Sequence, residues 1–536
     1  MNEQVKHFFH TRFITFFTFM LNYQLHGLDV TGYHVVNLAI HIINALLVYW
    51  LVVLTFKTPF FNFHPSSLIP HLLIALFSAL LFVSHPIQTQ AVTYITQRFT
   101  SLATLFYLLS LVMYVKFRTQ NTEHKVQNTD KRQKIFSLSS VFWYLTSVLS
   151  AVLAMKTKEI AFTLPIIIVL YEIFFFSKSQ NSETSSSMQN PPIPPLTKGG
   201  KGGFSCITRH AGLSDRQASR FLYFLFFLLT MLIIPLSLIG VNDRIDKLTE
   251  DLNEITKSGT SMSRWDYLFT QFRVIVTYVR LLFFPVNQNL DYDYPIYNSF
   301  LNPNVFLSFL FLLSIFGLGV YLFYYSKNPP SSPFYKGGIK GDQASPNSLT
   351  ITHHALRIMA FGIFFFFITL SVESSIIPIE DIIFEHRLYL PSIGLIIAFV
   401  SAVFCFSPYL SSFNLQPSSF LSRHALRITV LLLTTSVIVL AIATYQRNSV
   451  WQDVFRLCED MVKKSPKKAR THNNVGLAYY LKGETDKAIE HFQIALSLNP
   501  YYVPAHNNLY IAYTAKGWIK EGLQHFYIAQ SLKPHR

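Results

Sequence analysis

A short polar segment, EDIIFEHRLYLPS at residues 380–392, lies between two long apolar runs of the chain. Its ionisable side chains are Glu380, Asp381, Glu385, His386 and Arg387. Ionisable groups in or beside a lipid bilayer are costly to keep, and they indicate a function by default. The segment is therefore the first candidate for a functional site.

Three further connections between apolar runs carry polar side chains. They are SHPIQTQAVTYITQR (84–98) with Arg98 and several amides, MKTKEIAF (155–162) with Lys158 and Glu159, and NLDYDYP (289–295) with Asp291 and Asp293. Cations and N–H donors bind phosphates, and carboxylates can act as general bases. All three segments are therefore candidates as well.

A fourth polar pattern lies inside an apolar run. His34, Asn37, His41 and Asn44 are spaced by three, four and three residues, which places them on one helical face. Such a face must point into a helix bundle or a wet cavity. The simpler interpretation is interhelical hydrogen bonding, worth about 1 kcal/mol a pair. Metal binding by His34 and His41 is a weaker hypothesis, because two turns separate the two residues and no carboxylate accompanies them.

Composition indicates a membrane protein. Of 536 residues, 51% are hydrophobic and 13% charged, and the mean hydropathy is +0.32. The net charge of +16 comes mostly from Lys and Arg between apolar runs, where they set topology, so nucleic-acid binding is not expected. The three cysteines, Cys206, Cys405 and Cys458, have no metal-ligand spacing, and no metal or other cofactor is indicated.

Ten apolar segments have the bilayer-spanning length of about 17 to 25 residues. They are residues 35–56, 68–84, 100–117, 136–155, 160–177, 221–240, 304–325, 357–377, 391–410 and 428–445. The sequence thus predicts a mainly α, polytopic bundle over residues 1–446 in the inner (cytoplasmic) membrane. Basic connections such as 116–134 and 326–357 should be cytoplasmic, and the acidic 241–255 should lie outside.

Two segments test this topology. Residues 267–285 could span, but the loop charges then conflict, and Arg273 and Arg280 share one face, so we expect an interfacial helix. Residues 1–34 must lie outside although no helix precedes them. We expect that a first span has been lost; the alternative is insertion with the N-terminus outside.

All four polar connections lie on the outer side in this topology. Lys158 is then on the side that Lys and Arg usually avoid, which suggests a local task such as holding a phosphate. The alternative is that Lys158 and Glu159 only pair with neighbouring side chains. An outer site with arginine, lysine, tyrosine and carboxylates suits an anionic, lipid-linked substrate.

Residues 447–536 are soluble in composition and contain an internal repeat of 34 residues. Asn474, Tyr479 and Phe492 recur as Asn508, Tyr513 and Phe526. The pattern resembles the tetratricopeptide repeat, which predicts a C-terminal α-solenoid. The topology places these repeats outside the cytoplasm, where they would bind a protein acceptor or partner.

Two connections look like insertions. PPLTKGGKGGF in the loop near 178–220 and SPFYKGGIKGD in the loop near 326–356 resemble each other, and HALRI occurs twice in the chain. Basic tracts of this kind can bind lipid or protein. The simpler interpretation is repetitive DNA inserted where loops tolerate extra length.

The ordered motifs resemble those of a known family. SHPIQTQAVTYITQR, KTKEIAFTLPIIIVLYE, LLFFPVNQNLDYDYP and FEHRLYLPSIG, followed by the repeats, are similar to the transmembrane and TPR repeat-containing O-mannosyltransferase-like proteins, which have many bacterial members. The resemblance implies a GT-C-like fold. It also implies transfer of a sugar, mannose by family expectation, from a polyprenyl-phosphate carrier to protein hydroxyls outside the cytoplasm.

The resemblance also implies roles for residues. Arg387, His386 and Tyr389 would hold the carrier phosphate, Glu385 would orient Arg387, and Lys158 and Arg98 would be further phosphate ligands. Family members carry an Asp-Asp motif in an outer loop upstream of the point where this sequence begins, so the catalytic residue is unknown. Asp291 and Asp293 are weak substitutes.

Two other functions are compatible with the sequence. A transferase like the O-antigen ligases or polymerases would use a lipid pyrophosphate donor, although the ordered motifs do not favour it. A membrane scaffold without catalytic activity would present the repeats to partners. We therefore expect a glycosyltransferase-like protein that is either active or an inactive, truncated form.

Overall fold

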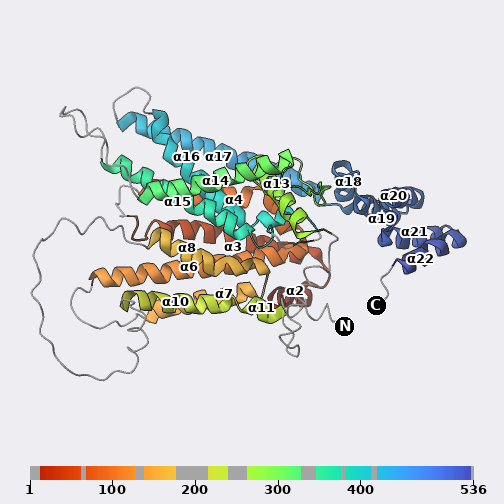
Figure 1. The fold of residues 1–536 in the computed structure, drawn as a ribbon, viewed down its shortest axis with the longest axis horizontal. Helices are drawn as coiled ribbons and strands as arrows, with labels where there is room; N and C mark the ends of the chain where they lie inside the picture. Colours follow the sequence, from red (N-terminus) through yellow and green to blue (C-terminus); the bar gives the residue numbers. More distant parts are fainter. Residues whose placement is uncertain are drawn as a thin grey trace, which may run out of the picture.

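The computed structural model describes residues 12–61, 68–127, 138–176, 215–238, 262–327, 346–375, 378–379, 381–411 and 419–532. Within these ranges the chain forms helices and turns and no strand. Figure 1 shows a bundle of long helices, from one end of which a row of shorter helices, α18 to α22, extends. The predicted mainly α architecture, a helix bundle followed by helical repeats, is confirmed.

Helices occupy all ten of the predicted apolar segments. They are α3 (Val30–Thr55), α4 (Leu68–Ser84), α6 (Arg98–Gln127), α7 (Leu138–Met155), α8 (Leu164–Phe175), α10 (Asp215–Thr230) with α11 (Ile233–Leu238), α14 (Pro303–Lys327), α15 (Pro346–Leu370), α16 (Pro391–Ser411) and α17 (Ser419–Val450). Their apolar side chains form one large core that includes Val48, Leu111, Ile168 and Phe365. A chain of this kind is an integral, multi-pass membrane protein.

Five of the described helices are long and apolar enough to span a membrane on their own, by length and composition. They are Val30–Thr55, Ile95–Asn121, Leu138–Met155, Pro303–Lys327 and Leu426–Val450. A sixth span is possible where Pro70–Ser84 and Pro86–Thr93 form a pair bent by 51°. Helix α8 has 12 residues and so covers about 18 Å of a hydrocarbon core about 30 Å thick. The total of ten spans stays a prediction.

Two glycines fix how α15 and α16 meet. A Cβ atom on Gly362 would overlap the carbonyl oxygen of Gly394, and a Cβ atom on Gly394 would overlap that of Gly362. Only glycine allows two helix backbones to approach this closely. The contact sets the position of the turn that follows α15 relative to the segment that precedes α16.

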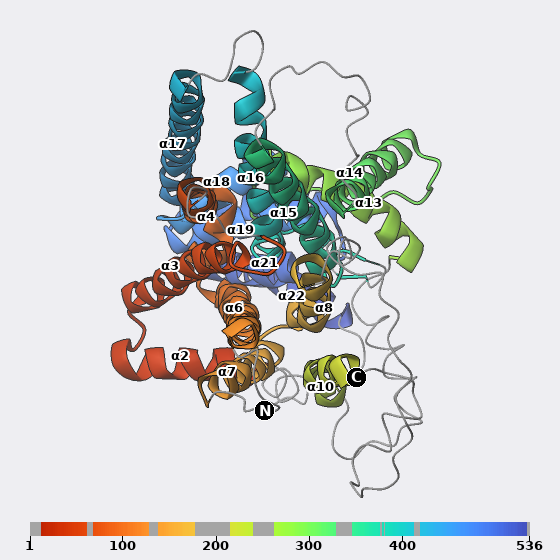
Figure 2. The same ribbon diagram turned by 90° about the vertical axis from the view of Figure 1, so that its left-hand side faces the viewer.

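Two helices lie at the end of the bundle that carries the repeats. Helix α2 (Phe13–His26), which the sequence analysis did not predict, crosses that end of the bundle in Figures 1 and 2. Helix α13 (Arg264–Phe283) packs Tyr267 and Tyr278 inward and is not among the helices that meet the criteria for a span. The interfacial position of α13 stays a prediction.

The C-terminal helices form the predicted repeats. They are α18 (Val454–Lys464), α19 (Ala469–Leu481), α20 (Thr485–Leu498), α21 (Val503–Ala515) and α22 (Ile519–Ser531). The turns within the two helix pairs use Gly483 and Gly517, whose φ values of +82° and +81° are left-handed and favour glycine. Helix α17 continues past residue 446 to Val450, and the predicted domain boundary at residue 446 stays a prediction.

Several sequence features lie outside the described residues. These are Glu380, Cys206 and the two KGG tracts near 194–204 and 332–342. Parts of the insert-like loops are described, because α10 begins at Asp215 and α15 at Pro346.

Candidate functional site

The four polar connections meet at the end of the bundle, as the sequence predicts. Gln90 accepts a hydrogen bond from the backbone N–H of His386 at 2.8 Å. Asn289 donates its backbone N–H to Glu385 at 2.8 Å. The connection at 155–162 joins the same region through Lys158, whose charge lowers the pKa of His386. Residues up to 300 positions apart in sequence are therefore brought into one polar region.

A buried ion pair lies at the centre of this region. The Nζ atom of Lys158 is 2.5 Å from Oε1 of Glu373, and it donates to Oγ1 of Thr100 at 3.0 Å. The two charged side chains are 7% and 12% exposed. Oε2 of Glu373 is also buried and has no hydrogen-bond partner among the described residues. Burying two charges is costly, so this pair is weak evidence that Lys158 and Glu373 serve only to stabilise the fold.

Arg387 lies beside the ion pair in the short 3-10 helix η7 (Glu385–Leu388). Its guanidinium donates to the backbone oxygens of Ile382 at 3.1 Å and Asp381 at 2.7 Å. The hydroxyl of Tyr267 hydrogen-bonds Arg387 and donates to the carbonyl oxygen of Glu373 at 3.1 Å. Burial alone would lower the pKa of Arg387, but the surrounding tyrosines and Glu373 raise it, so the side chain stays charged.

His386 is held as a neutral imidazole. Burial lowers its pKa well below 6.5, and the positive charges of Lys158 and Arg387 lower it further. Its Nδ1 atom is buried without a hydrogen-bond partner among the described residues, as is Nε2 of the neighbouring Gln90. A buried polar atom without a partner costs about 1 to 3 kcal/mol. Oε2 of Glu373 is a third atom of this kind, and a polar ligand would satisfy all three.

Glu385 has a different role from the one expected. It accepts hydrogen bonds from Gln288 at 3.0 Å, the backbone of Asn289 at 2.8 Å and the hydroxyl of Tyr292 at 2.7 Å. Burial raises the pKa of this carboxyl group. Glu385 therefore orients the loop at residues 288–292 and not the guanidinium of Arg387.

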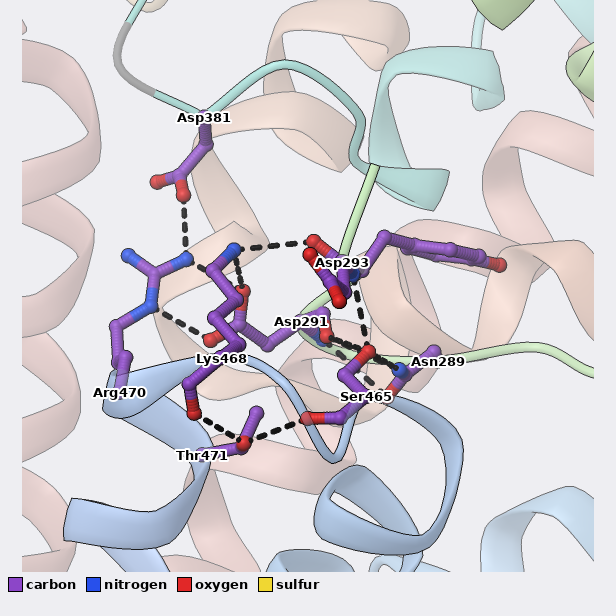
Figure 3. Close-up of polar contacts among 9 residues, drawn as sticks. Asn289, Asp291, Asp293, Asp381, Ser465, Lys468, Arg470 and Thr471 are labelled. Carbon is purple, nitrogen blue, oxygen red and sulfur yellow. Dashed lines mark hydrogen bonds and ion pairs between the residues drawn. The ribbon is translucent and has the colours of Figure 1, made fainter. Parts of the chain in front are cut away.

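The weak catalytic candidates lie where the repeats dock on the bundle (Figure 3). The carboxylate of Asp291 forms ion pairs with Lys468 and with Arg470, whose Nε is 2.6 Å away. Burial alone would raise the pKa of Asp291, but hydrogen bonds from Arg470 and Lys468 outweigh it and lower the pKa. Asp293 is exposed and donates its backbone N–H to Ser465 at 2.9 Å. This geometry gives Asp291 a structural role at the junction, and a catalytic role for Asp291 or Asp293 stays a prediction.

Arg470 extends the junction to the first candidate segment. Its guanidinium also pairs with the carboxylate of Asp381, and Ser465 donates to the carbonyl oxygen of Asp291 at 2.8 Å. A second set of contacts joins Lys464 to the carbonyl oxygen of Gln288 at 2.7 Å. The repeats are therefore attached to both loops that surround Glu385.

Tyr389 and Arg98 do not lie where phosphate binding requires. The hydroxyl of Tyr389 hydrogen-bonds Nδ1 of His41 at 2.7 Å and accepts from Asn44 at 3.1 Å, inside the bundle. Arg98 donates to Asn37 at 2.6 Å, and its guanidinium lies 4.4 Å from the ring of Phe19 in α2. Both side chains connect helices in this way, and their role as phosphate ligands stays a prediction.

The polar stripe on α3 is explained by these same bonds. Asn37, His41 and Asn44 are buried and hydrogen-bond the segment at 83–101 or Tyr389, while His34 is half-buried. The simpler interpretation, interhelical hydrogen bonding, is confirmed for the three buried residues.

Sequence reasoning missed Glu373 and Tyr267. Glu373 was placed inside the predicted span at 357–377, but α15 ends at Leu370 and leaves the carboxylate in the following turn. The signal was present, because a single acid at the end of an apolar run indicates a functional group. Tyr267 gave no signal, because aromatic residues are frequent in this chain.

The fold and the site define a multi-pass membrane protein with a buried ionised site beside docked helical repeats. The family model for the tetratricopeptide repeat matches residues 469–502. Protein O-mannosyl-transferase F38B6.6 of Caenorhabditis elegans is 40% identical over 109 residues, which are 20% of this chain and 14% of the relative.

Two longer matches extend along the chain. Protein O-mannosyl-transferase TMTC3 of Homo sapiens is 22% identical over 496 residues, 91% of this chain and 44% of the relative. Protein O-mannosyl-transferase Tmtc3 of Drosophila melanogaster is 23% identical over 513 residues, 90% of this chain and 48% of the relative. The chain is therefore similar to TMTC proteins along most of its length. It spans less than half the length of these relatives, and no solved structure matches it.

Proposed function

We propose that this protein transfers a sugar from a polyprenyl-phosphate carrier to hydroxyl groups of proteins, on the extracytoplasmic side of the membrane. The names of its relatives support glycosyl transfer and suggest mannose as the sugar. The expected GT-C-like fold is part of this proposal.

The observation that carries the proposal is the pairing of two buried cations at one end of a membrane bundle. Lys158 and Arg387 both lie close enough to His386 to lower the pKa of its imidazole. Two cations in a water-poor region bind a phosphate strongly, because electrostatic attraction is larger there than in water. A phosphate on a lipid carrier is held at the membrane boundary, where such cations would meet it.

An apolar groove offers a place for the lipid part of the carrier. A cavity of about 290 Å³ lies between α4, α16, α17 and the end of α13. Its lining includes Leu81, Phe283, Phe399 and Val439, together with the polar His85. Apolar walls of this kind suit an isoprenoid chain.

The chemistry of the proposed transfer places specific demands on these residues. As the acceptor oxygen attacks the anomeric carbon, the bond from that carbon to the phosphate oxygen breaks and negative charge grows on the phosphate. Arg387 and Lys158 would stabilise this charge, because they are fixed in position before the reaction. The carbonyl oxygens of Asp381 and Ile382 orient Arg387 for this role.

One observation favours a second function, a membrane scaffold without catalysis. The repeats are attached to the bundle by ion pairs from Asp291 and Asp381 to Lys468 and Arg470. A rigid attachment is what a scaffold needs to present a partner at a fixed place. A transferase would use the same attachment to present an acceptor.

A transfer assay on membranes separates the two functions. Labelled polyprenyl-phosphate mannose is supplied to the full chain, to Arg387→Ala, to Arg387→Lys and to Arg280→Ala. The last is a matched control, because Arg280 is an exposed arginine that donates to the carbonyl oxygen of Val286. We expect label in protein with the full chain and the control, and at least about 100-fold less with Arg387→Ala.

Two outcomes would contradict the proposal. If Arg387→Ala and Arg387→Lys incorporate as much label as the full chain, this arginine does not bind the donor. The absence of incorporation by the full chain, while pull-down with the repeats recovers a partner, would favour the scaffold.

A further inference from the structure

We propose that Glu373 is the carboxylate that accepts the proton of the acceptor hydroxyl. The inference rests on the proposed function and supplies the general base that the sequence does not identify. A general base must be a proton acceptor positioned beside the reacting oxygen, with one atom available to it.

Glu373 is held in place from several sides. Its backbone N–H donates to the carbonyl oxygen of Leu370 at 3.2 Å, and its own carbonyl oxygen accepts from Tyr267 at 3.1 Å. Its Oε1 atom is paired with Lys158. The carboxylate is therefore oriented through one oxygen, while the other, Oε2, is buried without a hydrogen-bond partner in the described part of the chain.

Three carboxylates at this end of the bundle have both oxygens in hydrogen bonds. Glu385 uses both oxygens to hold the loop at 288–292, and Asp291 uses both to bind the repeats. Glu159 forms hydrogen bonds to Arg12 through both oxygens, at 3.2 and 3.0 Å for Oε1 and 3.0 Å for Oε2. Among these four acids, Glu373 is the one whose second oxygen stays available for a proton.

Lys158 connects the base to the leaving group. An ammonium has three N–H donors, and Glu373 and Thr100 account for two of them. The same side chain can therefore hold the carboxylate and contact the carrier phosphate. This arrangement would place the acceptor hydroxyl between Oε2 of Glu373 and the anomeric carbon of the donor.

The step balances without any additional reactant. The acceptor O–H bond breaks and its proton moves to Oε2 of Glu373, while the acceptor oxygen forms a bond to the anomeric carbon. The bond from that carbon to the phosphate oxygen breaks, and its electron pair leaves with the polyprenyl phosphate. The protonated Glu373 then releases its proton to water.

The decisive variant is Glu373→Gln, which keeps the shape and the hydrogen bond to Lys158 but cannot accept the proton. We expect kcat to fall by about 100-fold or more, as is usual for loss of a general base. Binding of the labelled polyprenyl-phosphate sugar, measured on purified protein, should change by less than about threefold, because Arg387 and Lys158 remain. A merely structural role would lower binding and kcat together.

Two further variants keep the test decisive. Glu159→Gln is the matched control from the same end of the bundle, and its kcat should equal that of the full chain. Glu373→Asp keeps the charge opposite Lys158 if the glutamine variant does not fold. Its carboxylate is displaced by about one bond, which costs about 100-fold in kcat for a base that must touch the acceptor.

The outcomes separate this inference from the proposed function. Transfer by the full chain with unchanged kcat in Glu373→Gln would overturn the role of Glu373 and leave the transferase standing. An absence of transfer by the full chain would overturn the proposed function itself.

Discussion

The guanidinium of Arg387 donates a hydrogen bond of 2.7 Å to the backbone carbonyl oxygen of Asp381. The carboxylate of Asp381 in turn pairs with Arg470 at the start of the repeats. One residue thus links the proposed phosphate ligand to the C-terminal helices. The position of Arg387 therefore depends on a contact between two parts of the chain that the sequence presents as separate.

We expect Arg470→Ala to loosen the repeats from the bundle. The substitution removes the partner of Asp381 and one of the two cations that hold Asp291, so Asp291 keeps only Lys468. The connection after α17 should be cleaved faster in limited proteolysis, and donor affinity should fall as Arg387 loses its support. Lys487→Ala removes an exposed pair with Glu484 and should change neither quantity. Equal cleavage of the two variants would show that Arg470 does not hold the junction.

The pH dependence of stability should reveal the neutral state of His386. The pKa of His386 in the folded chain lies well below 6.5. Between that pKa and pH 6.5, the unfolded chain therefore binds a proton at this residue and the folded chain does not. The stabilisation is complete above pH 6.5 and is lost as the pH falls below that value. His386→Asn should flatten this part of the profile, measured as melting temperature between pH 7.5 and 5.

Other histidines contribute to the same window. The pKa values of His491 and His525 are lowered by burial and by a neighbouring histidine. The difference between the full chain and His386→Asn isolates the contribution of His386. An identical slope for the two proteins would mean that folding does not shift the pKa of His386.

The glycine contact between α15 and α16 should be intolerant of any side chain. Gly362→Ala places a methyl group against the carbonyl oxygen of Gly394 and should cost about 2 kcal/mol of unfolding free energy. Gly317→Ala is the matched control in α14, where nothing lies within 4 Å of the added atom. That change should stabilise the helix by about 0.5 to 1 kcal/mol. Thermal unfolding in detergent measures both, and a neutral Gly362→Ala would contradict the close approach.

Arg98 offers a direct test of how its role differs from that of Arg387. Arg98→Met removes the bond to Asn37 and the contact with Phe19, so α2 and α3 each lose one of their contacts with α6. We expect a loss of about 2 kcal/mol in stability, because Oδ1 of Asn37 loses its hydrogen-bond donor, with donor affinity unchanged. A fall in donor affinity with no loss of stability would restore the phosphate role that the sequence suggested.

The order and type of the helices could be predicted from the sequence, because they depend on the local pattern of apolar residues. Apolar runs of bilayer length identify helices such as α3 and α14, and the 34-residue period identifies the repeats. The bias of Lys and Arg toward one side predicts that the four polar connections meet, which they do. Arg387, Lys158 and His386 lie in one region, and their role as phosphate ligands stays a prediction.

The partners of individual side chains could not be predicted in the same way. The resemblance implies that Glu385 orients Arg387, but the side chain of Glu385 bonds to a loop almost 100 residues away. Tyr389 is next to the site in sequence, yet its side chain points into the bundle toward His41. Such directions are set by packing between distant elements and leave no local signal.

Helix α17 runs without a break from the bundle toward the repeats, and this fixes the position of the repeats. This helix has 32 residues, and near its end Thr444 donates to the carbonyl oxygen of Ser84 at 2.6 Å and Arg447 pairs with Asp460 at 2.8 Å. The repeats therefore have little freedom to swing. Under the proposed function, an acceptor polypeptide seated along them would reach Glu373 at a set number of residues from its point of attachment, so the repeats would select acceptor positions by spacing.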